Sequence, residues 1–312
     1  MTATFHHIDS NLTVIERGWL NCNQVVLTSP ERNVLIDSGY GRHAQRTIGY
    51  VEEALGAGTL HQLLNTHCHS DHMGGNRALA VHFGCEVVIP EGEVQHVVPW
   101  TAQSCWSEQM DQYAEEFAID ATLATGDIVH AGGRDWSAVA APGHDMDAVM
   151  FFADDGRILV SGDALWQKGM GFVWPESAGE SRTGFLDHAR ATLDVIEQLN
   201  PSTVIPGHGA PFGDVAAALA ESRTRLDAFA RDPAKHARHV VRALFVFSLL
   251  DRGSMRADAV ADYIRGVPVY GQMREEFLGG TNDELALALV SDLVRAGATK
   301  VVDGTLQPTM RA

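Results

Sequence analysis

Residues 66–75, with the sequence THCHSDHMGG, hold four side chains of metal-ligating type within six positions: His67, His69, Asp71 and His72. In extended backbone, side chains two residues apart point to the same side, so His67 and His69 can converge on one ion. Asp71 and His72 come as the chain turns into a predicted helix, where they can face a neighbouring position. Imidazoles and carboxylates suit a divalent ion such as Zn²⁺. The alternative is a polar helix cap with solvated histidines.

Three further residues of ligand type stand alone later in the chain. His144 follows Ala-Pro-Gly, Asp163 follows Val-Ser-Gly and His208 follows Ile-Pro-Gly. Each comes at the end of a predicted strand and directly after a glycine, which lets the chain leave the sheet and aim one side chain inward. Any one of them could be a hydrogen-bonded turn residue. Their joint occurrence with the histidine-rich run favours one metal site built from both.

The elements that must position these residues alternate between short strands and a few helices over the first two thirds of the chain. We predict a hairpin from 23–28 and 33–37, strands at 61–66, 85–89, 136–141, 148–153, 157–161 and 202–205, and helices at 42–55, 75–83 and 185–199. Residues 92–117 have mixed helical character. After Phe212 the sequence becomes rich in Ala and Leu, with helices predicted at 215–230 and 234–250 and a short strand near 300–302. We therefore expect two parts, residues 1–212 and a mostly helical region of residues 213–312.

The order HxHxDH, His after Pro-Gly, Asp after Ser-Gly, and Pro-Gly-His-Gly resembles the metallo-β-lactamase superfamily of hydrolases over about residues 12–212. The resemblance implies an α/β (α+β) fold, a four-layer αβ/βα sandwich, here with a C-terminal helical extension. It also implies two divalent metal ions, zinc or else iron or manganese, at the edge of the sheets. The residues that it assigns are His67, His69 and His144 for the first metal, Asp71, His72 and His208 for the second, and Asp163 as the bridge between them.

Two residues near these ligands have less certain roles. Asp37, at the end of Val-Leu-Ile-Asp, matches an acidic position that supports the histidine loop in the family. It could equally be a turn aspartate before Ser38-Gly39. Cys68 lies inside the motif but points away from both neighbouring histidines, so we expect a small buried packing residue there.

Two neighbouring ions can share a water and lower its pKa toward about 7. We therefore expect a metal-dependent hydrolase that uses a metal-bridging hydroxide to cleave an ester, thioester or lactone of a small acyl substrate, with Asp71 and Asp163 as catalytic residues. Asp163 and the lack of an export signal favour the glyoxalase II, thioesterase and lactonase branches over β-lactamases. However, glutathione-thioester enzymes carry a basic pair near the C-terminus, and Arg295 and Lys300 match it poorly.

Other interpretations of the same motif stay open. A persulfide dioxygenase shares the histidine loop but uses one iron, held by two His and one Asp. A nuclease of the RNA-processing branch would need a basic surface and an additional domain. A binding or signalling protein could keep the fold without catalysis, although the complete ligand set argues against it.

Composition limits the partners and the compartment. The 312 residues include 23 Lys and Arg against 40 Asp and Glu, a formal charge of −17 that repels phosphate backbones and argues against nucleic acid. The four cysteines show no CxxC spacing, the N-terminal residues lack a leader pattern, and no apolar stretch is long enough to span a bilayer. We expect a cytoplasmic protein, not bound to membranes, that acts on a small molecule and could form a homodimer.

Substrate choice is expected to depend on residues outside the metal ligands. Residues 166–183 directly follow the strand-end Asp163 and must return along the rim of the cleft, which suggests Phe172 and Trp174 as substrate-binding residues. In the helical region, Tyr263 and Tyr270 are candidates for closing the other side. These aromatic side chains could instead pack a domain interface or a dimer contact.

Overall fold

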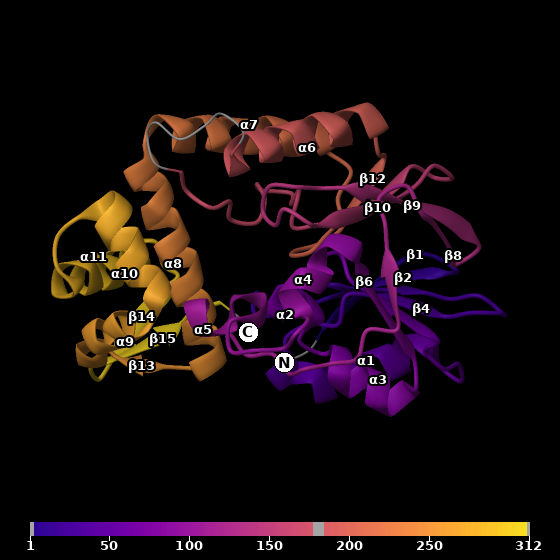
Figure 1. Ribbon diagram of the computed structural model, residues 1–312, viewed down its shortest axis with the longest axis horizontal. Helices are drawn as coiled ribbons and strands as arrows, with labels where there is room; N and C mark the ends of the chain where they lie inside the picture. The colour runs from indigo at the N-terminus through magenta and orange to yellow at the C-terminus, as the bar shows by residue number, and fades with distance from the viewer. Residues whose placement is uncertain (1–2, 177–183, 311–312) are drawn as a thin grey trace.

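The computed structural model describes residues 3–176 and 184–310, which form two facing β-sheets with helices on the outside (Figure 1). The first sheet has the strand order β1 (Thr4–Asp9), β2 (Leu12–Glu16), β3 (Gln24–Leu27), β4 (Val34–Ile36), β5 (Gln62–Leu64), β6 (Glu86–Pro90) and β7 (Ala121–Leu123). The second has the order β12 (Thr203–Pro206), β11 (Ile158–Gly162), β10 (Val149–Ala153), β9 (Arg134–Ala140) and β8 (Ile128–Ala131).

Each sheet combines antiparallel and parallel pairs. Strands β1 to β4 pair antiparallel, and β4 to β7 pair parallel. In the second sheet, β8 to β11 pair antiparallel and β12 lies parallel to β11. In the parallel pairs β4–β5 and β11–β12, the carboxyl ends of both strands therefore lie on the same side of the sheet. The loops that follow these strands meet there.

Apolar residues alternate between the two faces of the first sheet because side chains in a strand point to opposite sides. In β3, Val25 packs against the second sheet and Val26 against the helices, and in β6 Val88 and Val87 do the same. Helices α1 (Ala44–Leu55) and α3 (Asn76–Phe83) cover the outer face of this sheet, while α6 (Phe185–Leu199) and α7 (Val215–Arg231) cover that of the other. The expected four-layer αβ/βα sandwich is confirmed.

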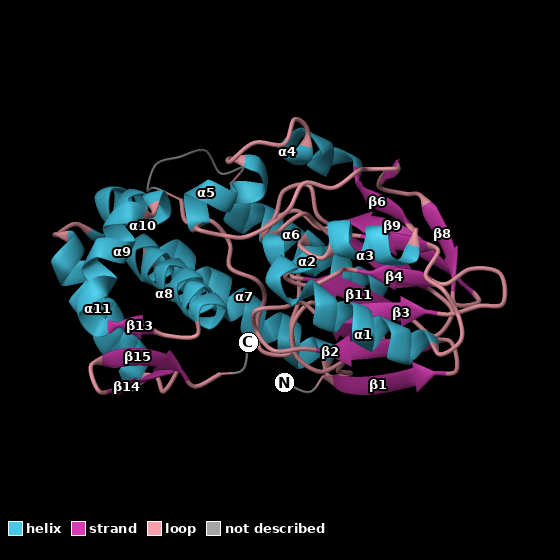
Figure 2. Cartoon of the chain, turned by 90° about the horizontal axis from the view of Figure 1, so that it is seen from below, coloured by secondary structure: helices cyan, strands magenta, loops and turns pink. Residues whose placement is uncertain are grey.

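The C-terminal region has an apolar cluster of its own, formed mainly by α8 and the elements after it (Figure 2). These elements are α8 (Pro233–Arg252), β13 (Met255–Arg256), α9 (Val260–Gly266), α10 (Pro268–Met273), η5 (Arg274–Leu278), α11 (Asn282–Arg295), β14 (Thr299–Val302) and β15 (Thr305–Pro308). Helix α7, by contrast, packs in the same cluster as α6. The division between residues 1–212 and 213–312 stays a prediction.

Helix α8 starts sharply because of its first residues. Pro233 occupies the first turn, where its missing N–H costs nothing, and the Asp232 side chain accepts a hydrogen bond from the Lys235 N–H at 2.8 Å. The chain turns here from α7, which lies along the sandwich, into α8, which runs down its open side (Figure 1).

Some local structure differs from the expectations or refines them. Residues 92–117, predicted to have mixed helical character, contain the short helices α4 (Val94–Val97) and α5 (Ser107–Met110) with 3-10 segments. Strands β1, β2, β7, β8, β13 and β15 were not predicted, since their short sequences, such as TFHHID in β1, lack a clear apolar alternation. Among the described residues, no helix has the length and apolar character needed to cross a membrane.

Tyr40 joins the sandwich to α8. Its ring is buried in the C-terminal cluster and meets Phe247 edge-on, with ring centroids 5.6 Å apart. Its hydroxyl donates to Asp251 Oδ2 at 3.0 Å and accepts from the Tyr113 N–H at 3.2 Å. Arg42 also pairs with Asp251, at 3.1 Å.

We expect Tyr40→Phe to lower the free energy of unfolding by about 1 kcal/mol, because it removes the hydrogen bonds of the hydroxyl but keeps the buried ring. Urea denaturation followed by circular dichroism measures this change. The matched control is Tyr113→Phe, which removes an exposed hydroxyl bonded to Glu115 and should change stability by less than about 0.5 kcal/mol. Equal effects of the two substitutions would contradict a joining role for Tyr40.

Candidate metal centre

All seven histidine and aspartate side chains singled out in the sequence converge at the edge where the parallel strands end. The histidine-rich run follows β5, Asp163 follows β11, His208 follows β12, and His144 lies in the loop between β9 and β10. They fall into two groups within which the potential ligand atoms lie no more than 4.8 Å apart: His67, His69 and His144 in one, and Asp71, His72, Asp163 and His208 in the other.

In the first group, the imidazoles are oriented by hydrogen bonds on their far sides. His144 Nδ1 donates to the Phe172 carbonyl at 2.5 Å, so its Nε2 faces the group, 2.8 Å from His69 Nδ1. His67 Nε2 is buried and has no hydrogen-bond partner among the described residues. Three nitrogens therefore converge on one point, with one of them unsatisfied.

In the second group, His72 is held in the same way. Its Nδ1 lies 2.8 Å from Asp37 Oδ2, a carboxylate oxygen that accepts the Nδ1–H. The buried Nε2 therefore faces the group and has no hydrogen-bond partner in the described chain. His208 Nε2 lies 3.1 Å from Asp71 Oδ2. The pair of His72 and Asp37 is an arrangement common at metal sites, where a histidine ligand donates the proton of its other ring nitrogen to a carboxylate.

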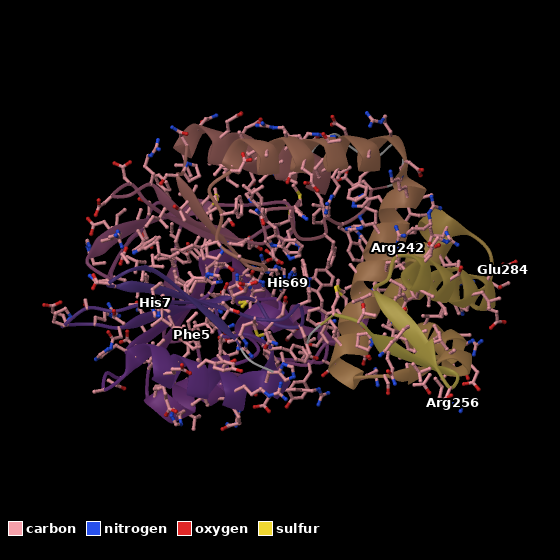
Figure 3. The ribbon with its side chains drawn as sticks, turned by 180° about the vertical axis from the view of Figure 1, so that it is seen from behind. Phe5, His7, His69, Arg242, Arg256 and Glu284 are labelled. Carbon is pink, nitrogen blue, oxygen red and sulfur yellow. The ribbon has the colours of Figure 1, made fainter. Side chains whose placement is uncertain are left out.

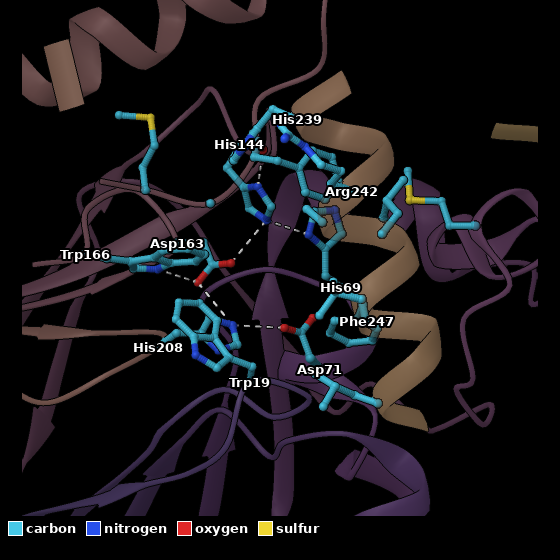
Figure 4. Close-up of a pocket in the computed structure, with 18 of the residues that line it drawn as sticks. Trp19, His69, Asp71, His144, Asp163, Trp166, His208, His239, Arg242 and Phe247 are labelled. Carbon is cyan, nitrogen blue, oxygen red and sulfur yellow. Dashed lines mark hydrogen bonds and ion pairs between the residues drawn. The ribbon is translucent and has the colours of Figure 1, made fainter. Parts of the chain in front are cut away.

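Asp163 lies between the two groups. Its Oδ2 is 3.4 Å from His144 Nε2 (Figure 4). Its Oδ1 is 3.4 Å from His72 Nε2. The indole N–H of Trp166 donates to Oδ1 at 3.1 Å and fixes the carboxylate plane. One side chain thus faces both sets of imidazoles.

Asp37 supports the loop from beneath. It accepts hydrogen bonds from the Thr66 N–H at 2.8 Å and the Thr66 hydroxyl at 2.9 Å, in addition to its contact with His72. Its backbone has a φ of 62°, which turns the chain at the end of β4. These contacts favour the supporting role over that of an ordinary turn residue.

The glycines around the ligands are needed for close approach. A Cβ at Gly207 would overlap Asp163 Oδ1, and one at Gly171 would lie 2.7 Å from His144 Nδ1. Gly143 and Gly162, directly before two ligands, have φ values of 144° and 50°. A side chain at Gly207 or Gly171 is excluded by lack of space. At Gly143 and Gly162 the backbone conformation disfavours any residue with a side chain.

The electrostatics fit a bound cation. Burial and then the neighbouring imidazoles lower the pKa of His67 well below its usual value, and burial and His144 lower the pKa of His69 to about 4. The pKa of Asp163 is lowered well below its usual range: burial opposes this shift, but the imidazoles of His72 and His208 outweigh it. Neutral imidazoles at His67 and His69, an ionised Asp163 carboxylate and two unsatisfied buried nitrogens form a donor set suited to divalent metal ions.

Several residues at this site were not identified from the sequence. Cys22, which follows no motif, lies with Asp37 and His72 in a third group of potential ligands, and burial raises its pKa to about 11. Asp145 Oδ2 lies 3.5 Å from His69 Nε2 and follows His144 directly, a position that could have suggested it. Cys68 is buried in the cluster beneath the first sheet, apart from these groups.

The two groups form the floor of a pocket of about 490 Å³ that lies between the sandwich and α8. Phe172 lines this pocket, as do Trp19 and Trp166, which pack around the His208 ring. Trp19 was not expected, because no pattern in the sequence connects it to the ligands.

The structure does not bring the other aromatic candidates to this pocket. Trp174 packs against the C-terminal cluster, and Tyr270 is fully buried within that cluster, next to Tyr263. Burial among apolar residues, rather than access to a substrate, accounts for Tyr270. Residues 177–183, the rest of the proposed rim, lie outside the described residues.

Comparison with known proteins agrees with this geometry. The profile of the metallo-beta-lactamase superfamily matches residues 17–208. The hydroxyacylglutathione hydrolase of Rhodospirillum rubrum is 30% identical over 122 residues, which are 39% of this chain and 40% of that protein. That of Nitrobacter winogradskyi is 27% identical over 222 residues, which are 69% of this chain and 79% of the relative. The match to the first of these relatives thus covers about two fifths of its length.

Solved structures share the fold at low sequence identity. BLEG-1 B3 metallo-beta-lactamase has a TM-score of 0.55 and 22% identity, covering 67% of this chain and 96% of that one. A metallo-beta-lactamase family protein from Thermus thermophilus has a TM-score of 0.52 and 20% identity, covering 95% and 94%. Because the family profile covers more than half of the 312 residues and the same fold is found, this chain belongs to the metallo-beta-lactamase superfamily.

Proposed function

We propose that this protein is a metal-dependent hydrolase that holds two divalent ions, zinc as the first candidate, and cleaves an ester, thioester or lactone of a small acyl substrate. The observation that carries the proposal is the pair of His/Asp groups that share Asp163 on the floor of one pocket. The hydroxyacylglutathione hydrolases among its relatives favour thioesters within this class. The partner is then a small molecule, and the acidic composition, with the four cysteines free and buried, is consistent with the cytoplasm.

In this proposal His67, His69 and His144 hold one ion, Asp71, His72 and His208 hold the other, and Asp163 bridges them. Two such ions, when bound, lower the pKa of a shared water and polarise a carbonyl oxygen. The chain's own residues keep this arrangement fixed. Asp37 and the Phe172 carbonyl hold the Nδ1 protons of His72 and His144, so that Nε2 of each ring stays free to bind.

Other residues control the surroundings of the reaction. Trp166 keeps the Asp163 carboxylate in one orientation by donating to Oδ1. Trp19 stacks on the His208 ring with a centroid distance of 5.4 Å and an interplanar angle of 8°, and so limits its rotation. The apolar lining, including Phe172 and Phe247, excludes water from the acyl group and strengthens the electrostatic interactions at the floor.

The first prediction concerns the metal content. Protein purified without chelator should contain two divalent ions per chain by elemental analysis. Asp163→Asn removes one negative charge and one coordinating oxygen, so we expect it to lose one ion more readily and to lower turnover by about two orders of magnitude or more, with the fold intact. Asp154→Asn, at an exposed turn position, is the matched control. An active Asp163→Asn protein with two ions would contradict the bridging role.

The reaction class is tested with metal-loaded enzyme on thioesters, esters, lactones and a phosphodiester. We expect hydrolysis of at least one acyl class, abolished by Asp163→Asn, and no cleavage of the phosphodiester. Oxygen consumption with a persulfide and a single iron per chain would instead identify a dioxygenase. Cleavage of the phosphodiester alone would identify a phosphodiesterase, and either result would overturn the proposal.

The apolar wall gives a prediction about specificity. Phe172→Ala should raise KM for medium-chain acyl substrates by about tenfold with little change in kcat, because the ring would contact the acyl chain while its backbone carbonyl still holds His144. Phe172→Leu should retain most of the affinity. Unchanged KM values across an acyl-chain series, with unchanged metal content, would show that this side chain does not select the substrate.

A further inference from the structure

The pocket at the metal centre is also lined by basic residues from α7, α8 and the loop after β11. Lys168, Arg225, His239 and Arg242 line the same pocket as His69 and Asp163. Figure 4 shows His239 and Arg242 on the side of the pocket away from Trp19 and Trp166, and Figure 3 shows Arg242 on α8. One side of the pocket is therefore basic.

A second recess, of about 450 Å³, adjoins this side. Arg225, His239 and Arg242 line it as well, together with Lys235, Thr224 and the ring of Phe229. Glu221 is the one acidic residue among the side chains that line it in the described chain. Lys168 lines only the first pocket and Lys235 only this recess, whereas the two arginines line both. We refer to Lys168, Arg225, Lys235 and Arg242 together as the basic recess.

This concentration of positive charge is unusual for the chain. The net charge is −17, and two of only three lysines, Lys168 and Lys235, lie in the basic recess. Its charges are incompletely neutralised. Arg225 pairs with Glu221 at 3.2 Å, whereas Arg242 lies 3.7 Å from Asp292, which also pairs with Arg295.

The position of Arg225 is built into the backbone. Its guanidinium donates to the Lys168 carbonyl at 3.0 Å and lies against Gly169, where a Cβ would overlap Nη1. Gly169 has a φ of 114°, which side chains rarely adopt. The loop that leaves the metal centre thus holds the Arg225 guanidinium in the wall of the pocket.

The lowered pKa of His239 reflects its burial next to positive charges. Burial, followed by the positive charges of Arg225, His236 and Arg242, lowers the pKa of His239 to about 4. At neutral pH the ring is therefore an uncharged hydrogen-bonding group beside two guanidinium groups. A bound anion would relieve the repulsion among these cations.

We propose that the basic recess binds an anionic group, a phosphate or a carboxylate, on a substrate whose scissile acyl bond lies at the metal centre. Apolar side chains that line the same pocket, among them Leu244 and Phe247, would contact the uncharged part of that substrate. Arginine forks suit both anions, and each charge-assisted hydrogen bond is stronger than a neutral one. This proposal rests on the proposed function and narrows its substrate to amphipathic, anionic acyl compounds.

The test compares pairs of thioesters that differ only in one anionic group. Butyryl-pantetheine and butyryl-4′-phosphopantetheine place a phosphate on the leaving thiol, and hexanoyl- and adipoyl-N-acetylcysteamine place a carboxylate on the acyl end. We expect kcat/KM to favour the anionic member of at least one pair by about tenfold, the effect of one net charged contact. The pair that shows the preference identifies the source of the anion.

The variant Arg225→Gln/Arg242→Gln should reduce this preference to about one- to twofold, with unchanged metal content, where the preference is the ratio of kcat/KM values for the two members measured on the same protein. Arg231→Gln/Arg238→Gln is the matched control, since it also removes two positive charges, from exposed positions on α7 and α8 outside both recesses. It should keep the preference. Equal kcat/KM within both pairs, or equal loss in the control variant, would overturn the inference.

Binding separates this inference from the reaction class. Quenching of the fluorescence of Trp19, Trp106 and Trp166, which line the pocket, reports ligands without turnover. We expect 4′-phosphopantetheine to bind about tenfold more tightly than pantetheine, or adipate about tenfold more tightly than hexanamide. This preference should be lost in Arg225→Gln/Arg242→Gln. If no thioester, ester or lactone is cleaved but this preference holds, the proposed function fails and the anion site stands. If thioesters are cleaved without any preference for the anionic member, the anion site fails and the proposed function stands.

Discussion

The structure of the site depends on one electrostatic constraint: several imidazoles and two carboxylates are brought together with little access to water. His67 and His72 each keep a buried nitrogen without a hydrogen-bond partner in the described chain, which is costly unless another group occupies the space that it faces. Asp163 lies where its two oxygens reach both sets of imidazoles. The strand ends, the glycines that allow close approach and the supporting contacts of Asp37 all serve to hold this arrangement. Bound divalent metal ions would balance it.

The sandwich alone does not enclose a pocket. Helix α8 crosses the open edge of the two sheets and provides the wall opposite the metal centre, while the loop after β11 provides Phe172 and the backbone that holds Arg225. Tyr40 and Asp251 fix α8 to the sandwich, so the distance between the two walls depends on contacts far from the ligands in sequence. Chemistry and substrate choice are thus divided between two parts of the chain that meet at this pocket.

The distribution of charge follows the same division. The acidic chain carries most of its negative residues on the surface, whereas the pocket and the adjoining recess together collect two lysines and two arginines. A field of this kind attracts small anions to the pocket while the rest of the surface repels large polyanions. Glutathione-thioester enzymes carry a basic pair near the C-terminus that this sequence lacks. In this chain, Arg225 on α7 and Arg242 on α8 would take the place of that pair.

The sequence by itself determined which residues gather at the edge of the sheets. The spacing of His67, His69, Asp71 and His72, and the glycine before each of His144, Asp163 and His208, are local patterns, and the structure brings all seven together. The fold class followed from the same motifs. The predicted helices at 215–230 and 234–250 also agree closely with α7 and α8.

Only the tertiary structure decided what surrounds those residues. Trp19, Cys22, Arg225 and Arg242 reach the site from segments that carry no motif, because their positions depend on how helices and sheets pack across long sequence separations. Tyr270, a good candidate by residue type, is buried instead, since an aromatic ring in an apolar helix gains more from the core than from a cleft. Local patterns encode the direction of a side chain and the turn of a strand, whereas the walls of a pocket depend on the packing of the whole chain.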